Sequence, residues 1–232
     1  MTNSRGGKQK IPRPRNWSVG DPPPWQLQEI SAITLDLVAK IFTDTSRNPH
    51  REESKERKSS VMIPLYENKG EVWMVLTRRS ETMRFHTSEV SFPGGSHEPQ
   101  DTDAWSTALR ETQEEIGLDP SLPSLVGHLD PFVTVGSQSY VTPFIAILES
   151  PPDLEANPKE VEKILHVPLS ELLSSDVYRE EVWVLENGTE RKISFFELDG
   201  DTVWGATGRM IREFLTKTLN LDDFNTIENL AK

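Results

Sequence analysis

The sequence predicts a layered α/β fold, in which strands and helices are mixed along the chain. Two kinds of pattern predict it: short apolar stretches bounded by turn residues, and longer stretches with apolar residues at helical spacing, chiefly 104–116 and 204–219. The chain has 232 residues, of which 35% are hydrophobic, so it can bury a core and form one globular domain with tails.

The first 58 residues divide into three parts. Residues 1–24 carry five basic side chains, one acidic side chain and three consecutive prolines, a composition that predicts a disordered, extended tail. Residues 25–42 repeat apolar side chains at helical spacing and predict a first helix. Residues 47–58 are almost wholly polar and predict an exposed linker, so we assign 25–58 to a helix and a charged linker.

Strand patterns follow the linker. The stretches 61–66 and 71–77 flank the turn-prone Asn68-Lys69-Gly70 and predict a hairpin. A helix at 104–116 and apolar runs at 125–129 and 141–148 come next.

A second hairpin and a closing helix are predicted near the end of the chain. The stretches 181–186 and 191–196 flank Asn187-Gly188, a strong hairpin signal, and 204–219 reads as a helix. We therefore expect the main domain at 59–220 and a C-terminal tail at 221–232.

The charge balance of the chain makes some classes of binding partner unfavourable. The chain has 25 Lys and Arg against 37 Asp and Glu, a net charge of −12, which disfavours binding to a nucleic-acid backbone. No run of about 18 apolar residues is present, so no membrane-spanning helix is expected. The chain has no cysteine and its first 15 residues lack an apolar core segment, so we expect a cytoplasmic protein.

The helix predicted at 104–116 carries an unusual acidic face. Glu111, Glu114 and Glu115 fall within an arc of roughly 100°, beside a separate apolar arc that can pack. Like charges at this spacing repel, and carboxylates in the last turn of a helix oppose its dipole. Arg110 can offset only part of this charge, and a hard divalent cation, Mg²⁺ or Mn²⁺, would supply the rest. The alternative is a solvated acidic face.

Glycines flank the acidic helix on both sides. Gly94 and Gly95 permit a close approach of the backbone to a ligand before the helix, and Gly117 can provide a left-handed cap that ends it.

This segment resembles the Nudix box, a loop, helix and loop that bind a magnesium-diphosphate. Gly95 begins the match and Arg110-Glu111-Thr112-Gln113-Glu114-Glu115-Ile116-Gly117-Leu118 completes it. Asp101 stands where the family has its first glutamate, eight residues instead of seven separate it from Arg110, and Thr112 replaces the usual aliphatic residue. The resemblance implies the Nudix α/β/α sandwich with a mixed β-sheet.

The longer spacing and an upstream signature resemble the coenzyme A pyrophosphatase branch of that family. The signature reads Val75-Leu76-Thr77-Arg78-Arg79-Ser80, then Arg84, then Ser88, then Phe92-Pro93-Gly94-Gly95. Ser88 replaces a glycine of that branch, at a position that calls for unusual backbone angles or close ligand approach. The branch implies Mg²⁺-dependent hydrolysis of coenzyme A or acyl-coenzyme A, a small-molecule substrate, to adenosine 3′,5′-bisphosphate and a phosphopantetheine.

The resemblance also implies residue roles. Glu111 and Glu115 would be metal ligands, and Glu114 would be a further ligand or the base for the attacking water. Glu160, in a loop with Asn157 and Pro158, is the rival base. The remaining candidates are expected to bind substrate phosphate, through guanidinium groups or through close backbone approach: Arg79, Arg84, Gly94 and Gly95.

Two other functions remain open at this stage. One is a Nudix hydrolase of another nucleoside diphosphate derivative, such as an ADP-sugar or an oxidised nucleotide. The other is a nucleotide-binding sensor without turnover, which the presence of all three box glutamates disfavours. The sequence leaves the oligomeric state open, and a homodimer is compatible with it.

Overall fold

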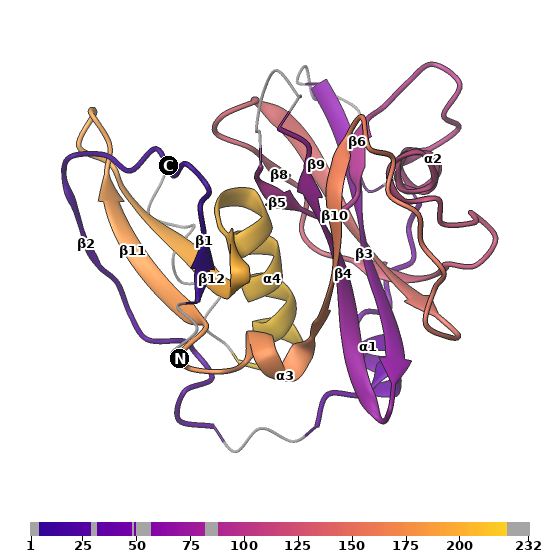
Figure 1. The fold of residues 1–232 in the computed structure, drawn as a ribbon, viewed down its shortest axis with the longest axis horizontal. Coiled ribbons are helices and arrows are strands. Elements are labelled where there is room, and N and C mark those ends of the chain that lie inside the picture. Colours follow the sequence, from indigo (N-terminus) through magenta and orange to yellow (C-terminus); the bar gives the residue numbers. More distant parts are fainter. Residues whose placement is uncertain (1–4, 29–31, 48, 50–56, 82–87, 222–232) are drawn as a thin grey trace. The chain divides into compact units, whose positions relative to one another are not determined.

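The computed structural model describes residues 5–28, 32–47, 49, 57–81 and 88–221, and Figure 1 labels its elements. The chain forms two compact units. We call Ile33–Leu169 the central unit, and Met1–Ala32 with Ser170–Lys232 the terminal unit. This division differs from the predicted domain at 59–220, because strands from the first 24 residues pair with the hairpin near the end of the chain.

The central unit is built on a mixed β-sheet. Its strand order is β10-β4-β3-β9-β7, with the short strands β5, β6 and β8 added on β4, β3 and β9. β3 and β9 run parallel, and the other pairs of this sheet are antiparallel. The predicted α/β class with a mixed sheet is confirmed. The strands are β3 (Arg57–Asn68), β4 (Glu71–Arg79), β5 (Val90–Ser91), β6 (Gly94–Ser96), β7 (Ser124–His128), β8 (Phe132–Val133), β9 (Ser139–Leu148) and β10 (Val161–Pro168).

The first predicted hairpin is confirmed as β3 and β4. Asn68 lies opposite Glu71, and both intervening residues have positive φ, 54° at Lys69 and 78° at Gly70. Two consecutive residues with positive φ match the twist of an antiparallel pair. Strand β10 was not expected from the sequence, because the adjacent Glu162 and Lys163 interrupt the alternation of apolar and polar residues that predicts a strand.

Helix α2 (Ala104–Ile116) packs its apolar face on the sheet, as the sequence predicts. Ala104, Ala108 and Ile116 are buried in one cluster with Met62 and Phe144 of strands β3 and β9. Trp105 contributes an edge-to-face contact with Phe144, at 5.4 Å between ring centroids. Each large side chain buried in this way stabilises the unit by about 1.5–3 kcal/mol, which fixes the helix on the sheet.

The first helix is shorter than predicted. Helix α1 is Leu35–Ile41, beginning after Thr34, whose side chain accepts a hydrogen bond from the Leu37 amide at 3.1 Å. Residues 25–28 form turns and a bend instead of a helix. The predicted helix at 25–42 was therefore wrong at its start, because Trp25 is buried in the other unit against Tyr178 and Phe196.

The terminal unit is a four-stranded sheet with the order β1-β12-β11-β2. The predicted hairpin is confirmed: β11 and β12 are antiparallel and joined through Asn187-Gly188. The predicted closing helix corresponds to α4, which packs against β12. The elements of this unit are β1 (Gly6–Gly7), β2 (Trp17–Val19), β11 (Tyr178–Val184), β12 (Glu190–Val203) and α4 (Gly205–Thr218), and the short α3 (Leu169–Leu172) begins at the last residue of the central unit.

The segment predicted as a disordered tail is a part of this sheet. β1 runs parallel to β12, and β2 runs antiparallel to β11, so the chain start flanks the hairpin on both edges. Two of the basic side chains find acidic partners there: Arg13 binds Glu181 at 2.9 Å, and Arg5 binds Asp176 at 2.8 Å. The prediction of disorder was wrong for residues 5–24, because residues distant in sequence pair with β1 and β2 and with the side chains of Arg5 and Arg13.

Two other predicted segments lie largely outside the described residues. These are 50–56 of the predicted linker and 222–232 of the predicted C-terminal tail. The last two linker residues, Arg57 and Lys58, begin β3. Among the helices of the described ranges, none combines the length and the apolar character needed to cross a membrane.

Candidate active site

Helix α2 has well-defined ends. Asp103 caps its start: the carboxylate accepts the Ser106 amide at 2.7 Å, and the Ser106 hydroxyl accepts the Asp103 amide at 3.0 Å. Gly117 ends the helix with a left-handed φ of 68°, as predicted. The caps fix where the helix begins and ends, and the packing of its apolar face on the sheet fixes its rotation and therefore the direction of its glutamates.

The three glutamates of the acidic face are not equivalent. The Glu115 side chain is 3% exposed and that of Glu111 is 14% exposed, whereas Glu114 is 52% exposed. Gly95 explains the burial of Glu111, because a Cβ at Gly95 would lie 2.5 Å from the Glu111 carboxyl carbon. Gly94 is equally constrained, with φ 149° and the Ser60 carbonyl oxygen 2.3 Å from an added Cβ. Gly95 thus allows strand β6 to lie against the Glu111 carboxylate, and Gly94 allows β6 to lie close to β3.

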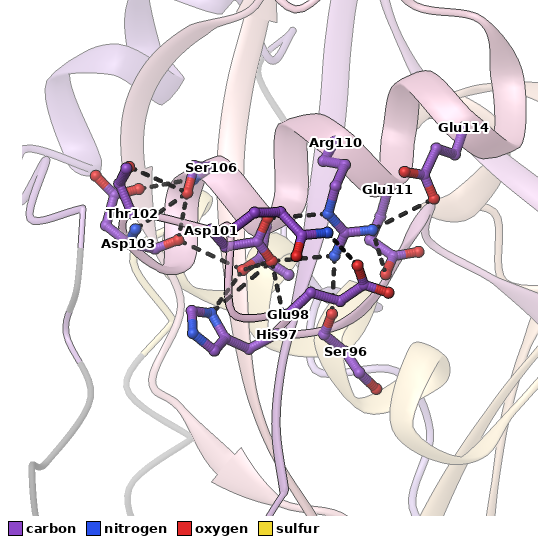
Figure 2. Close-up of polar contacts among 12 residues, drawn as sticks. Ser96, His97, Glu98, Asp101, Thr102, Asp103, Ser106, Arg110, Glu111 and Glu114 are labelled. Atoms are coloured by element: carbon purple, nitrogen blue, oxygen red, sulfur yellow. Dashed lines mark hydrogen bonds and ion pairs between the residues drawn. The ribbon is translucent and has the colours of Figure 1, made fainter.

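Arg110 connects the glutamates to the loop before the helix, as Figure 2 shows. Its Nε and Nη2 bind the two oxygens of Asp101 at 2.9 and 3.0 Å, and Nη2 also donates to the Ser96 carbonyl at 2.9 Å. Its Nη1 lies 3.0 Å from Glu111 and 3.3 Å from Glu114.

Asp101 completes this ion-pair network. The hydrogen bonds from Arg110 lower the pKa of Asp101 to about 2, so it stays ionised, and the same pairing raises the pKa of Arg110. Asp101, which departs from the Nudix pattern, thus serves as the anchor of Arg110.

Glu115 lies deepest in the site. Its Oε2 accepts the Gly94 amide at 3.3 Å, and its Oε1 lies 3.5 Å from Nη1 of Arg79. Burial raises the pKa of Glu115 to about 8, against the opposing effects of Arg79 and the Gly94 amide. The upstream signature and the box therefore meet at this one carboxylate. Arg84, the second arginine of that signature, lies outside the described residues.

Glu160 lies at the start of β10, next to the end of β4. Its carbonyl accepts the Ser80 amide at 2.8 Å, and the following residue, Val161, pairs with Arg79. The Glu160 charge contributes to the raised pKa of both Glu111 and Glu115, so the structure brings all three into one electrostatic environment.

Asn157 matters more than the sequence suggested. It contacts the end of α2 with its backbone and its side chain, and its place in the loop expected with Pro158 and Glu160 was the sequence signal. Ser88 has φ 59°, so the unusual backbone expected there is confirmed.

The donor set at this end of α2 fits a hard divalent cation. It consists of carboxylate oxygens, the ligands that Mg²⁺ and Mn²⁺ prefer. Burial raises the pKa of Glu111 as well as that of Glu115, so Arg79 and Arg110 compensate the two charges incompletely. Over the described ranges, no three His, Cys, Asp or Glu side chains already converge as a closed cage. Mg²⁺ commonly uses only one or two carboxylates together with water and substrate phosphates.

Comparisons with known proteins identify the family to which the chain is similar. The family model described as NUDIX domain matches residues 56–186. An uncharacterized Nudix hydrolase NudL of Photorhabdus laumondii is 35% identical over 178 residues, covering 77% of this chain and 94% of that relative. The peroxisomal coenzyme A diphosphatase NUDT7 of Mus musculus is 40% identical over 121 residues, 52% of this chain and 51% of the mouse protein. Among solved structures, a MutT/nudix family protein from Enterococcus faecalis has a TM-score of 0.48 and 15% identity, covering 75% of this chain and 66% of that one.

The fold and the site define an α/β protein in which a pair of glycines precedes a helix that carries three glutamates. More particularly, the chain belongs to the Nudix hydrolase family. It is therefore an enzyme, a Nudix pyrophosphohydrolase.

Proposed function

We propose that this enzyme hydrolyses the diphosphate bond of coenzyme A or an acyl-coenzyme A, with Mg²⁺ as the cofactor and Mn²⁺ as a substitute. The products are adenosine 3′,5′-bisphosphate and the corresponding phosphopantetheine. The observation that carries the proposal is the meeting of the two signatures at Glu115, which Arg79 and Gly94 both contact. The printed name of the mouse relative, a coenzyme A diphosphatase, supports the same substrate class.

The reaction is a hydrolysis at phosphorus. A water oxygen forms a bond to one phosphorus atom, the bond from that phosphorus to the bridging oxygen breaks, and the bridging oxygen leaves with the electron pair. The water proton passes to a carboxylate, for which the candidates are Glu160 and Glu114. When bound, a divalent cation neutralises negative charge on the diphosphate.

Different residues of the chain would bind the cation, orient its ligands and bind the substrate. Glu111 and Glu115 would hold the cation, with Glu114 as a further ligand. Arg110 would keep Glu111 and Glu114 oriented through the contacts it already makes. Arg79 and Arg84 would bind substrate phosphate, because guanidinium groups offer paired, permanently charged donors. Gly94 and Gly95 would contribute backbone groups to the substrate site, because Gly95 lies against the Glu111 carboxylate and the Gly94 amide binds Glu115.

Product analysis tests the proposal directly. The purified full chain is incubated with coenzyme A, with and without Mg²⁺, and the products are identified by mass spectrometry. We expect Mg²⁺-dependent adenosine bisphosphate and phosphopantetheine, lost in Glu115→Gln and kept in Glu149→Gln, a matched change at an exposed glutamate after β9.

Two results would overturn the proposal. Intact coenzyme A beside a cleaved ADP-sugar or oxidised nucleotide would show that the substrate class is wrong. No cleavage of any diphosphate in a panel with Mg²⁺ or Mn²⁺ would instead indicate a nucleotide-binding sensor.

A further inference from the structure

The C-terminal end of α2 is closed by a segment that lies about 40 residues further along the chain. The last four carbonyls of a helix lack partners within it and must find them elsewhere. Here the Glu155 amide donates to the Ile116 carbonyl at 3.0 Å, and the Asn157 amide donates to the Glu115 carbonyl at 2.9 Å. The Asn157 side chain adds a third bond, from Nδ2 to the Glu114 carbonyl at 3.3 Å. Asn157 therefore contacts the backbone of two of the three box glutamates.

Asn157 also organises the turn that follows it. Its backbone carbonyl accepts the amides of Glu160 and Val161 at 3.0 and 2.8 Å, and its Oδ1 accepts the Lys159 amide at 3.2 Å. An asparagine side chain that accepts a backbone amide two residues later is a common way to fix a turn. On its other side, Glu160 is held by the Ser80 amide at 2.8 Å. The position of Glu160 is thus set jointly by Asn157 and by the end of β4.

We propose that Asn157 is a positioning residue for hydrolysis: it ties the turn that carries Glu160 to the last turn of α2, and so sets Glu160 relative to Glu111 and Glu115. This inference rests on the proposed function, because it concerns the same reaction. The side chain must supply a donor toward Glu114 and an acceptor toward Lys159 at once. Aspartate has the same shape but lacks the donor and turns an oxygen toward the Glu114 carbonyl.

Serine provides a milder variant. Its hydroxyl can still support the turn, but its shorter side chain cannot span to the Glu114 carbonyl. Comparing Asn157→Ser with Asn157→Asp therefore separates the bond to α2 from the turn itself, and keeps the test open if the aspartate variant fails to fold.

The test is a double-mutant cycle on kcat and KM with coenzyme A and Mg²⁺. We expect Asn157→Asp to lower kcat about 10–100-fold with KM changed less than about twofold, because misplacement of a reacting group mainly affects the chemical step. Asn157→Ser should give a smaller loss. Asn187→Asp is the matched control, since Asn187 fixes a turn through the Thr189 amide at 3.0 Å but lies in the hairpin of the terminal unit, and its activity should be unchanged.

The effect of Asn157→Asp in a Glu160→Gln background shows whether Asn157 acts through Glu160. In a Glu160→Gln background, Asn157→Asp should cause less than about a twofold further loss of kcat, because the group it positions is already disabled. A full, multiplicative loss in that background would overturn the inference. So would an unchanged kcat in both Asn157 variants.

Hydrogen exchange separates a failure of this inference from a failure of the proposed function. The Glu160 and Val161 amides, which the Asn157 carbonyl accepts, should exchange at least about fivefold faster in Asn157→Asp. If the unaltered chain cleaves no diphosphate, the proposed function fails. The exchange rates then test by themselves whether Asn157 holds the turn that carries Glu160. Unchanged exchange would mean that the Asn157 side chain does not hold Glu160.

Discussion

The two units each bury a glutamate, yet they treat its charge in opposite ways. Glu181 in the terminal unit and Glu115 in the central unit are both 2% exposed. Glu181 is bound by Arg13 and Arg179, and it accepts the Trp183 indole N–H at 2.6 Å. Burial alone would raise the pKa of Glu181, but hydrogen bonds from Arg13 and Trp183 and the charge of Arg179 outweigh it, and the pKa is lowered. For Glu115 burial prevails, and the pKa rises to about 8.

We interpret Glu181 as a carboxylate that serves stability, and we propose that Glu115 serves chemistry. A buried charge with complete hydrogen bonding has no need of a further partner, whereas an incompletely compensated one favours binding a cation. Equal burial therefore gives no indication of function, and the number and placement of the donors do. Three predictions test this interpretation, and a fourth tests the backbone at Ser88.

The largest expected effect is on catalysis. Glu115→Gln should lower kcat/KM at least about 100-fold, because it removes a candidate metal ligand and its charge. Its midpoint of thermal unfolding without metal should change little at pH 7, since a carboxyl with a pKa of about 8 is already mostly protonated there. Activity assays and calorimetry on one preparation check both. A variant that is inactive only because it is unfolded would contradict the proposed difference between Glu115 and Glu181.

The next largest effect is expected in the terminal unit, where stability should change and catalysis should not. Glu181→Gln should destabilise the protein by about 2 kcal/mol, because hydrogen bonds to an ionised group are lost. Its kcat/KM should stay within about threefold of the unaltered enzyme. Urea unfolding measures the first and a steady-state assay the second. A stable, inactive Glu181→Gln variant would contradict the assignment of a structural role.

Asp101 is a third buried carboxylate, which lies within the candidate site and can be compared with Glu115 and Glu181. Asp101 is 3% exposed at its side chain and fully engaged by Arg110, and its pKa of about 2 lies below the ordinary value of 3.8. A depressed pKa means that its contribution, about 2 kcal/mol, is present above about pH 4 and is lost as the pH falls toward 2. Asp101→Asn should therefore be less stable by about that amount at pH 7.

Stability measured against pH checks this prediction. The curves for Asp101→Asn and the unaltered chain should approach each other below about pH 3. Asp153→Asn, at an exposed position, serves as the control and should leave the curve unchanged. Parallel curves down to pH 2 would mean that the Arg110 pair does not stabilise the fold.

The smallest effect concerns the backbone. Ser88 has φ 59°, a left-handed value that costs a residue with a side chain about 1–2 kcal/mol. Ser88→Gly should accordingly raise stability by up to about 1 kcal/mol, because glycine also loses more entropy on folding. Ser91→Gly in β5 is the control and should destabilise by about 0.5–1 kcal/mol. A loss of stability in Ser88→Gly would show that the serine side chain compensates for the strain.

Local patterns could be predicted from the sequence. The span of α2, its cap at Gly117 and the hairpin at Asn187-Gly188 depend on residues close together in the chain, and all three agree with the structure. The anchoring of Arg110 depends partly on its spacing to Glu114, which the sequence also gives.

Long-range contacts could not be predicted. Gly6 lies beside Asp199, and nothing in a basic, proline-rich segment indicates such a partner. For the same reason the acidic face looked uniform, although β6 and Arg79 bury Glu115 while Glu114 stays exposed. The difference that matters for function arises from elements distant in sequence.

The pairing of the first strands with the last hairpin also has a consequence for biosynthesis. The central unit is continuous in sequence, so a nascent chain can complete it as soon as residue 169 has left the ribosome. β1 and β2 must instead wait for β11 and β12, which at typical elongation rates takes on the order of 10 s. The basic N-terminal segment is accessible to chaperones throughout that interval, whereas the site-bearing unit can fold in its last part, once residue 169 has emerged.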